Sequence, residues 1–344
     1  MIKIAVDVMG GDLGVESTIS GLRVYSTKYD CSDVAFLLFG NEKIIESKLS
    51  ESPHNLLYRV YDTGDNIISG NEKPTHALKN GRGTSMFEAI NSVAKGDADA
   101  VVSSGNTGAY MALSKILIGT IEGIERPAIV SILPNLKGNT VMLDLGANTD
   151  CSSRKLVQFA VMGNAVSNIL QKIDSPKIGL LNIGTEKSKG TDSLEEAYNI
   201  LQESKDLNFI GFVEGTDITK GTADVIVTDG FSGNISLKTM EGTIKYIVHT
   251  LKKGFSSSLM GKIGYLFSRN VFRKLKDAID PRYHNGAPLV GLKKISIKSH
   301  GNSDSIGFSN AISVAVRLAK SEFIKNIEEK ISEIERKNSD DSNK

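Results

Sequence analysis

Short runs of apolar residues recur along the chain, and most of them end in a loop rich in glycine and small polar residues. The runs are nearly continuous and rich in β-branched side chains, which is typical of strands buried on both faces of a sheet. The predicted strands span residues 2–8, 34–39, 98–102, 128–133, 140–145, 177–183, 223–228 and 294–298.

Stretches with a helical pattern lie between these runs. The predicted helices span residues 84–95, 109–122, 155–172, 193–203, 236–253 and 309–335. Strands that alternate with helices over the whole length predict an α/β fold with a parallel, doubly wound sheet and helices on both faces. No linker divides the pattern, so we predict a single α/β/α unit over residues 1–337 and a flexible tail over the polar residues 338–344.

Composition excludes several classes of protein. Lysine and arginine number 41, and aspartate and glutamate number 40; the resulting net charge of +1 argues against a nucleic-acid-binding protein. No run of about 18 apolar residues is present, so we expect no membrane span. Two cysteines and the lack of a basic leader before an apolar core predict a cytoplasmic protein. The 33 glycines against 7 prolines indicate close backbone approaches on a regular scaffold.

The glycine-rich loops after the predicted strands are candidates for a ligand site. Ligands of open α/β sheets bind at the carboxyl ends of the strands, so we expect these loops to meet at one edge. Glycine lets backbone N–H groups approach an anion, and a helix that begins in the loop adds the positive end of its dipole. The loop from Ser104 to Gly108 fits this description best. For any single loop, a tight turn or a helix cap is the alternative.

Searches for other reactive motifs are mostly negative. No GxGxxG follows the first strand, no GxSxG is present, and residues 184–191 hold a lysine before the second glycine instead of after it, unlike a P-loop. Cys151 has no evident histidine partner and is interpreted as a structural thiol. The five histidines include no ligand-spaced pair, so no metal is predicted. His300 follows a predicted strand and lies in a glycine-containing loop. It is interpreted either as a residue that lines the site or as an ordinary turn residue, and both interpretations stay open.

A basic amphipathic segment lies within residues 252–276, where no acidic residue occurs. On a helical wheel its basic side chains fall opposite Met260, Ile263, Phe267, Val271 and Leu275. We predict a helical insertion at about residues 252–280 that contacts an anionic membrane or an acidic protein. The predicted contact residues are Lys262, Phe267, Arg269, Arg273 and Lys276. A core helix with a solvated basic face and a dimer arm are the alternatives.

Taken together, the loops resemble one known family. From Met1 to about Leu318 the chain resembles the PlsX family of bacterial phosphate acyltransferases. The matching segments include IAVDVMGGD at residues 4–12, ADAVVSSGNTGAYMA at 98–112, LDLGANTDC at 143–151, LLNIGTEKSKG at 180–190, VTDGFSGNISLK at 227–238, NGAPLVGL at 285–292 and SHGNS at 299–303.

This resemblance implies a reaction in which an acyl carrier protein thioester and inorganic phosphate give an acyl phosphate and free carrier protein, without a cofactor. It implies that a glycerol-phosphate acyltransferase then uses the product in phospholipid synthesis. It also implies a three-layer α/β/α fold related to phosphate acetyltransferases and isocitrate-dehydrogenase-like enzymes. The expected form is a cytoplasmic homodimer that associates peripherally with the membrane.

Within the resemblance, we interpret Lys189 and Asn234 as catalytic. The lysine neutralises phosphate or the thioester oxyanion, and the amide donates a hydrogen bond at the same centre. The other candidates are substrate-binding residues of the strand-end loops, with capping or loop bracing as the alternative for the aspartates. They are Asp7, Gly10, Gly11, Asp12, Ser104, Gly105, Asn106, Thr107, Asp144, Asn148, Asp229 and His300.

Three other functions stay open at this point. A phosphate acetyltransferase-like enzyme would use coenzyme A thioesters as the acyl donor. A nucleotide-dependent phosphotransferase of the actin-like class would agree with the short segments at residues 7–10 and 144–148. A membrane-associated scaffold would bind the carrier protein without catalysis.

Overall fold

The computed structural model of the protein describes residues 1–341, except the side chains of residues 276–279, 281, 335 and 337–341. In this part of the chain, eleven strands form one sheet in the order β3-β2-β1-β4-β11-β10-β5-β6-β9-β7-β8. The strands are β1 Ile2–Asp7, β2 Val34–Gly40, β3 Leu57–Asp62, β4 Ala100–Ser103, β5 Ala128–Asn135, β6 Gly138–Leu143, β7 Lys177–Leu181, β8 Asn208–Val213, β9 Val225–Val227, β10 Ala287–Val290 and β11 Ile295–Lys298.

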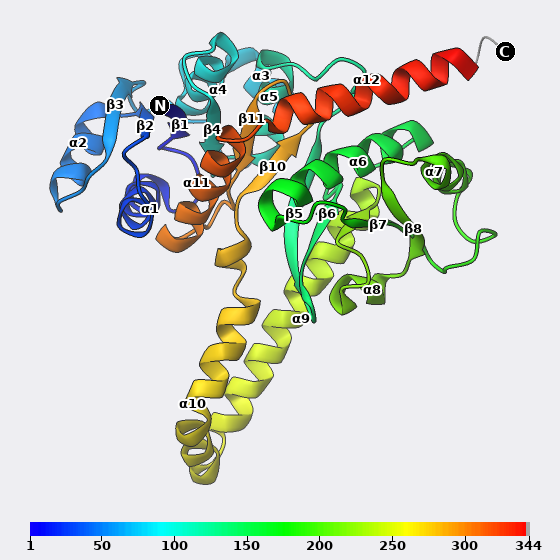
Figure 1. Ribbon diagram of the computed structural model, residues 1–344. Helices are drawn as coiled ribbons and strands as arrows, with labels where there is room; N and C mark the ends of the chain where they lie inside the picture. The colour runs from blue at the N-terminus through cyan, green and yellow to red at the C-terminus, as the bar shows by residue number, and fades with distance from the viewer. Residues whose placement is uncertain (342–344) are drawn as a thin grey trace.

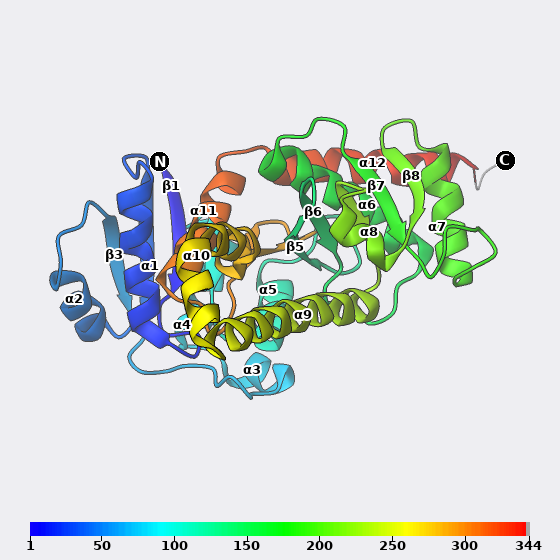
Figure 2. The same ribbon diagram turned by 90° about the horizontal axis from the view of Figure 1, so that it is seen from below.

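Helices cover both faces of the sheet (Figures 1 and 2). They are α1 Gly14–Lys28, α2 Glu42–Ser50, α3 Pro74–Asn80, α4 Ser85–Lys95, α5 Thr107–Leu117, α6 Ser153–Val166, α7 Asp192–Glu203, α8 Gly215–Lys220, α9 Gly230–Ser256, α10 Leu259–Ile279, α11 Ser305–Ala319 and α12 Phe323–Asp341. In strand β1, apolar side chains point to both faces of the sheet, so both faces have to be covered by helices. Ile4 and Val6 pack into one buried cluster with α1 and α11, and Ala5 packs into another with α4 and α5. The predicted three-layer α/β/α fold is confirmed.

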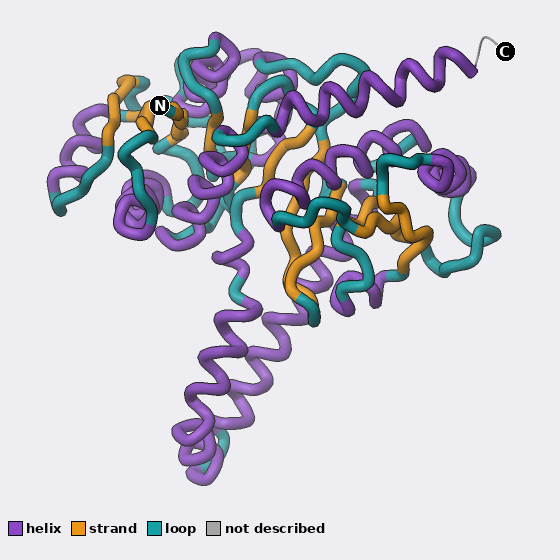
Figure 3. Tube along the Cα trace, in the orientation of Figure 1, coloured by secondary structure: helices purple, strands orange, loops and turns teal. Residues whose placement is uncertain are grey.

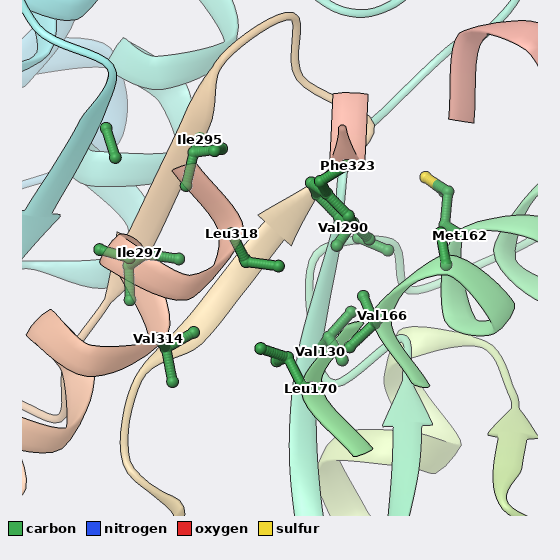
Figure 4. Packing of buried hydrophobic residues seen from close by; sticks show 14 of the residues in the cluster. Val130, Met162, Val166, Leu170, Val290, Ile295, Ile297, Val314, Leu318 and Phe323 are labelled. Atoms are coloured by element: carbon green, nitrogen blue, oxygen red, sulfur yellow. The ribbon is translucent and has the colours of Figure 1, made fainter. Parts of the chain in front are cut away.

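The first of these clusters joins the two halves of the sheet. Figure 4 shows Val290 of β10 near Val130 of β5 and Phe323 of α12, with Ile297 of β11 on one side of them and Met162 of α6 on the other. Every one of these side chains is almost completely removed from solvent. One apolar core therefore runs from the N-terminal strands into the strands that follow residue 128.

Strand directions change in the middle of the sheet. The strands β1, β2, β3, β4 and β11 are mutually parallel, whereas β10 is antiparallel to both β11 and β5. Strand β6 is then antiparallel to β5, and β9, β7 and β8 continue in the direction of β6. Strands β6, β7 and β9 consequently run in the opposite direction to β1, β4 and β11 along the sheet.

The helices α9 and α10 form an antiparallel hairpin that projects from the body of the molecule (Figures 1 and 3). The two helices are joined near the tip by the rings of Phe255, Tyr265 and Phe272, whose centroids lie 4.8–6.0 Å apart. The insertion predicted at about residues 252–280 therefore begins earlier, because α9 already leaves the sheet at Gly230. In residues 1–341 no helix is both long and apolar enough to span a membrane.

Several predicted boundaries differ from the structure for local reasons. The sequence analysis does not predict β3, which mixes polar and apolar residues, or β10, which has only four residues including a proline. It also misses the edge strand β8, although polar Asn208 stands only at its start. The single helix predicted over residues 309–335 breaks between α11 and α12, where the Ser321 hydroxyl donates to the Leu318 carbonyl. Helix α12 continues to Asp341, beyond the predicted end of the catalytic unit. Residues 342–344 of the predicted tail lie outside the described residues.

Candidate functional site

The strand-end loops form two clusters, and no hydrogen bond or ion pair described in residues 1–341 joins one cluster to the other. That all of these loops meet at one edge stays a prediction. We define the first cluster as residues 7–12, 103–108 and 298–304, which follow β1, β4 and β11. The second cluster comprises residues 144–151, 182–191 and 228–235, which follow β6, β7 and β9. Because the central antiparallel strands reverse the chain direction, the strands that lead to the first cluster run opposite to those that lead to the second.

Asp7 is at the centre of the first cluster and is completely buried. The hydroxyl groups of Ser85 and Ser103 donate to its two carboxylate oxygens, at 2.7 and 2.6 Å. Burial raises the pKa of the Asp7 carboxyl, and the two serine hydrogen bonds oppose that rise. Because the Asp7 carboxylate has no exposed surface and both of its oxygens accept serine hydrogen bonds, it braces the floor of the cluster. This placement supports the bracing alternative for Asp7.

The glycines of the first cluster allow its loops to pack against each other. A Cβ atom on Gly10 would lie 2.4 Å from Asp7 Oδ2, and one on Gly105 would lie 2.4 Å from Met86 Cε. Gly11 adopts a φ of 92°, which side chains rarely adopt. The Ser104 hydroxyl then donates to the Gly10 carbonyl at 2.8 Å and joins the two loops.

Asn106 caps helix α5 and braces a neighbouring loop. Its Oδ1 accepts from the Ala109 N–H at 3.0 Å, and its Nδ2 donates to the carbonyls of Ser69, Gly70 and Glu72. The side chain predicted to cradle phosphate is therefore fully engaged with the protein. Thr107 is exposed, and in the described chain the first N–H groups of α5, at Thr107 and Gly108, have no hydrogen-bond partner.

Lys298 is a member of the first cluster that the sequence did not single out. Its side chain is 7% exposed, its ammonium donates to the Ser299 carbonyl, and burial lowers its pKa to about 8 against the attraction of Asp7 and Asp12. Asp12 itself is exposed, and its N–H donates to the Gly301 carbonyl at 2.7 Å. The cluster therefore holds a buried cation beside the predicted acidic residues.

The loop that carries His300 is fixed from its other side by the base of the hairpin. Asn285 accepts from the His300 N–H at 2.9 Å and donates to the hydroxyl groups of Ser299 and Ser303 at 2.8 and 3.0 Å. Arg282 bonds Asp304 at 2.9 Å as well as Asp280. The imidazole of His300 is exposed at the rim of the cluster.

In the second cluster, Asp144 organises the loop after β6. Its carboxylate accepts from the N–H groups of Ile129, Ala147 and Asn148 at 2.9, 3.1 and 2.6 Å. The Asn148 amide donates to Asp144 and to the Pro127 carbonyl, both at 2.9 Å, and its Oδ1 is buried without a partner. Burial raises the pKa of the Asp144 carboxyl, and the hydrogen bonds oppose this rise. Like Asp7, Asp144 is placed to brace its loop.

Helix α9 begins directly against this loop. Asp229 caps the helix, because its carboxylate accepts from the Ser232 N–H at 2.8 Å and from the Ser232 hydroxyl at 2.9 Å. One turn later the exposed side chain of Asn234 lies beside Gly146, where a Cβ would be 3.7 Å from Asn234 Cγ. The amide predicted to be catalytic is therefore accessible at the rim of the second cluster.

Lys189 lies on the loop after β7 and is half exposed. Its ammonium pairs with Glu186 at 3.0 Å, and its carbonyl accepts from the Asn182 amide at 2.8 Å. The structure describes no contact between Lys189 and Asn234. An exposed ion pair of this kind contributes only about 0–1 kcal/mol, so the ammonium can exchange Glu186 for another anion at little cost.

Cys151 is the last residue of the loop segment that follows β6 in the second cluster. The thiol is buried, and burial together with the negative charges of Asp144 and Asp229 raises its pKa to about 12. The thiolate needed for nucleophilic attack is therefore scarce at neutral pH. This agrees with the interpretation of Cys151 as a structural thiol. In residues 1–341, no group of three or more His, Cys, Asp or Glu side chains is placed to hold a metal ion.

The hairpin exposes the apolar side chains of the basic segment. Phe267 is 85% exposed and Met260 76%, and Lys262, Arg269 and Arg273 are also exposed. The predicted contact residue Lys276 has a side chain that lies outside the described ones. Both the apolar and the basic side chains of the projecting helix α10 are thus exposed among the described residues.

Sequence reasoning missed the cluster residues Ser85, Ser103, Arg282, Asn285 and Lys298. A signal existed for Lys298, since a charged residue ends an otherwise buried strand next to the SHGNS loop. The family-like segment NGAPLVGL begins at Asn285, but the contacts of Asn285, like those of Ser85, depend on partners elsewhere in the sequence.

Comparison with known proteins identifies close relatives along almost the whole chain. A model of the family described as fatty acid synthesis protein matches residues 2–326. The phosphate acyltransferase of Rhodospirillum rubrum is 44% identical over 336 residues, which cover 97% of this chain and 95% of the relative. That of Paramagnetospirillum magneticum is 46% identical over 318 residues, which cover 92% and 90%.

Solved structures share the fold at much lower identity. A phosphotransacetylase from Streptococcus pyogenes superposes with a TM-score of 0.60 at 18% identity and covers 92% of this chain and 94% of its own. The EutD phosphotransacetylase from Staphylococcus aureus gives a TM-score of 0.57 at 16% identity, with the same coverage. At these identities the likeness concerns the fold alone.

Proposed function

The chain belongs to the phosphate acyltransferase family, and we propose that it transfers a fatty acyl group from an acyl carrier protein thioester to inorganic phosphate. The observation that carries the proposal is the 44% identity with a phosphate acyltransferase over 97% of the chain. Phosphate as a substrate and acyl transfer as the reaction follow from the family. The carrier protein as donor and a free acyl phosphate as product are the proposed part.

The reaction needs no dedicated nucleophile on the protein. Phosphate is largely dianionic at neutral pH, since the second pKa of related phosphates is about 6. One phosphate oxygen forms a bond to the thioester carbonyl carbon, the carbon–sulfur bond breaks, and the carrier protein leaves as a thiolate that takes a proton from solvent. A thiol with a pKa of about 8.5 is a good leaving group without strong acid assistance. Positioning and charge stabilisation are what the enzyme has to supply.

Lys189 and Asn234 are the proposed catalytic residues. Both side chains are accessible at the second cluster, and Lys189 is held only by an exposed ion pair. In the proposal, the Lys189 ammonium leaves Glu186 to neutralise phosphate or the thioester oxyanion, and the Asn234 amide donates a hydrogen bond to the same centre. The loop that carries Lys189 has to approach the start of α9 for this to happen.

The first cluster is proposed to supply backbone donors. The free N–H groups of Thr107 and Gly108 at the start of α5, together with the helix dipole, favour an anion there. Asn106 keeps those groups in place through its four hydrogen bonds. His300, exposed on the neighbouring loop, is proposed to lie near the thioester. Asp7 and Asp144 act as braces.

The projecting hairpin is proposed to bind both the acidic carrier protein and an anionic membrane surface. Exposed Phe267 and Met260 would enter the membrane interface, while Arg269 and Arg273 meet acidic groups. This arrangement supports an enzyme that works at the cytoplasmic face of the membrane, where a glycerol-phosphate acyltransferase would use the acyl phosphate. We also propose that the chain forms a homodimer, in which a second copy of the chain covers part of the exposed apolar surface of the hairpin.

The donor specificity is tested by comparing long-chain acyl carrier protein with long-chain acyl-coenzyme A in the presence of phosphate. The proposal predicts that the carrier protein gives the higher kcat/KM. A preference for coenzyme A would assign the phosphate acetyltransferase-like reaction instead. Carrier protein binding without thiol release would identify a non-catalytic scaffold, and turnover that requires ATP would point to a phosphotransferase.

A further inference from the structure

Three strand ends of the first cluster carry polar side chains in one row. Asp7 pairs with Ser103 across β1 and β4, and Ser103 pairs with Lys298 across β4 and β11. Residues in register on neighbouring strands project their side chains on the same face of the sheet, about 4.8 Å apart. The carboxylate of Asp7 and the ammonium of Lys298 therefore point to one side, with the Ser103 hydroxyl between them.

The surroundings of Lys298 provide little direct pairing for a buried cation. An ammonium has three N–H donors, and the one hydrogen bond described for this group goes to the Ser299 carbonyl. No carboxylate lies within ion-pair distance among the described residues, although Asp7 and Asp12 attract the charge from farther away. Removing a cation from water is costly when the compensation is incomplete. Fold stability alone does not account for a lysine here, because an apolar side chain would fill the space at lower cost.

Lys298 lies at the junction of the two loops that form one wall of the cluster. On one side, the Asp12 N–H donates to the Gly301 carbonyl at 2.7 Å, and the Ser104 hydroxyl donates to the Gly10 carbonyl at 2.8 Å. On the other side, the Ser299 N–H donates to the Ser103 carbonyl at 2.9 Å. The ammonium therefore contacts the backbone of the second loop, and it stands in one row with Asp7, the residue from which the first loop leads.

We propose that Lys298 is a positioning residue of the acyl transfer: its ammonium holds the Gly10–Asp12 loop and the Ser299–Ser303 loop in a fixed relation to each other. It acts by attracting Asp12 from one loop and bonding the Ser299 carbonyl of the other. The consequence is a fixed placement of His300 and of the loop backbone beside the start of α5. This inference rests on the proposed function only for its effect on activity.

The test compares Lys298→Met with the matched control Lys294→Met, which removes an exposed lysine just before the same strand. We expect Lys298→Met to lose at least about tenfold in kcat/KM while its urea midpoint stays equal or rises, as is common when a hydrophobe replaces a buried ion. The kcat/KM of the wild-type enzyme should also fall above about pH 8, because Lys298 then loses the positive charge that attracts Asp7 and Asp12. The low activity of Lys298→Met should not show this fall. Activity of Lys298→Met within twofold of wild type, or a loss that merely follows its unfolded fraction, would overturn the proposal.

Hydrogen exchange of the same full-length proteins tests the positioning without any substrate. The reporters are the Asp12 N–H, bonded to Gly301, and the Ser303 N–H, bonded to the His300 carbonyl at 3.1 Å. We expect exchange in segments 9–13 and 299–304 to be at least about tenfold faster in Lys298→Met and unchanged in Lys294→Met. Unchanged protection in both segments would overturn the inference. A wild-type enzyme that fails to turn over would refute the proposed reaction and leave this measurement as the test of Lys298.

Discussion

Asp7 and Lys298 stand on either side of Ser103 in one row of the sheet, and both are buried at the carboxyl ends of parallel strands. Ser103 bonds the carboxylate at 2.6 Å, so the acidic end of the row is tightly held, whereas the ammonium bonds only a backbone carbonyl. Burial raises the pKa of the aspartate and lowers that of the lysine, and each charge opposes the shift of the other. The pair makes the first cluster sensitive to pH and to substitution at either end.

The stability of the protein should rise with pH because of Lys298. Burial lowers the pKa of this group from 10.5 to about 8. Between these two values the unfolded chain binds a proton that the folded chain has released, so raising the pH through this interval favours the folded state. We expect the free energy of unfolding of wild type relative to Lys298→Met to increase over that interval, as measured by urea denaturation. A difference that stays constant with pH would show that the lysine is not buried as a charged group.

Asp7→Asn should be destabilising, and its effect should depend on Lys298. The substitution removes the charge that faces the ammonium and perturbs the bonds with Ser85 and Ser103, at a cost of about 1–3 kcal/mol. In the Lys298→Met background the same change should cost less, with a coupling energy of about 0.5 kcal/mol or more. A double-mutant cycle of unfolding free energies measures this coupling. Strictly additive costs would show that the two charges do not interact.

Lys189→Ala and Asn234→Ala should each impair catalysis without unfolding the protein, because both side chains are exposed. Removing one donor to a developing oxyanion commonly costs about 10²-fold in kcat, and we expect losses of this order for each variant. Lys187→Ala, on the same loop but directed at the Tyr198 ring, is the control. The rate of acyl phosphate formation is the measurement. If both variants stay within about twofold of wild type, the catalytic assignment is wrong.

Charge reversal on the hairpin should weaken binding to its partners. Each basic residue near an anionic surface contributes about 1 kcal/mol, so the double variant Arg269→Glu/Arg273→Glu should lose at least about 30-fold in affinity for anionic vesicles, for the carrier protein, or for both. Phe267→Asp should reduce vesicle binding alone. Lys205→Glu, on an exposed loop of the body, is the matched control. Flotation and carrier protein binding are measured side by side, and full retention in both would leave the hairpin as a dimer arm.

The sequence predicts the buried strands well because each is a short, continuous apolar run. It misses the edge strand β3, which is partly exposed and mixes polar residues into the pattern. It also misses the edge strand β8, where residues 209–213 form a short run without polar side chains. It also does not predict the reversal of strand direction in the middle of the sheet. The reason lies in β10, a four-residue strand with Pro288 that reverses the sheet direction and leaves almost no trace in the pattern of hydrophobic residues.

Individual site residues are predictable to different degrees. The positions of Asp7, Asp144 and Asp229 at strand ends follow from the sequence, but their burial and capping bonds depend on partners elsewhere in the chain. Asn106 illustrates this, because the carbonyls of residues 69–72 that it binds belong to a loop with no motif of its own. The charge of Lys298 at the end of a strand is evident in the sequence. Its relation to Asp7 follows only from the structure, in which β4 lies between β11 and β1.

The most direct test of the central claim follows thiol release from a long-chain acyl carrier protein with and without inorganic phosphate, in the absence of nucleotide. We predict that thiol appears only when phosphate is present, with one acyl phosphate formed for each thiol released. Thiol release that does not depend on phosphate, or no release by protein shown to be folded, would contradict it.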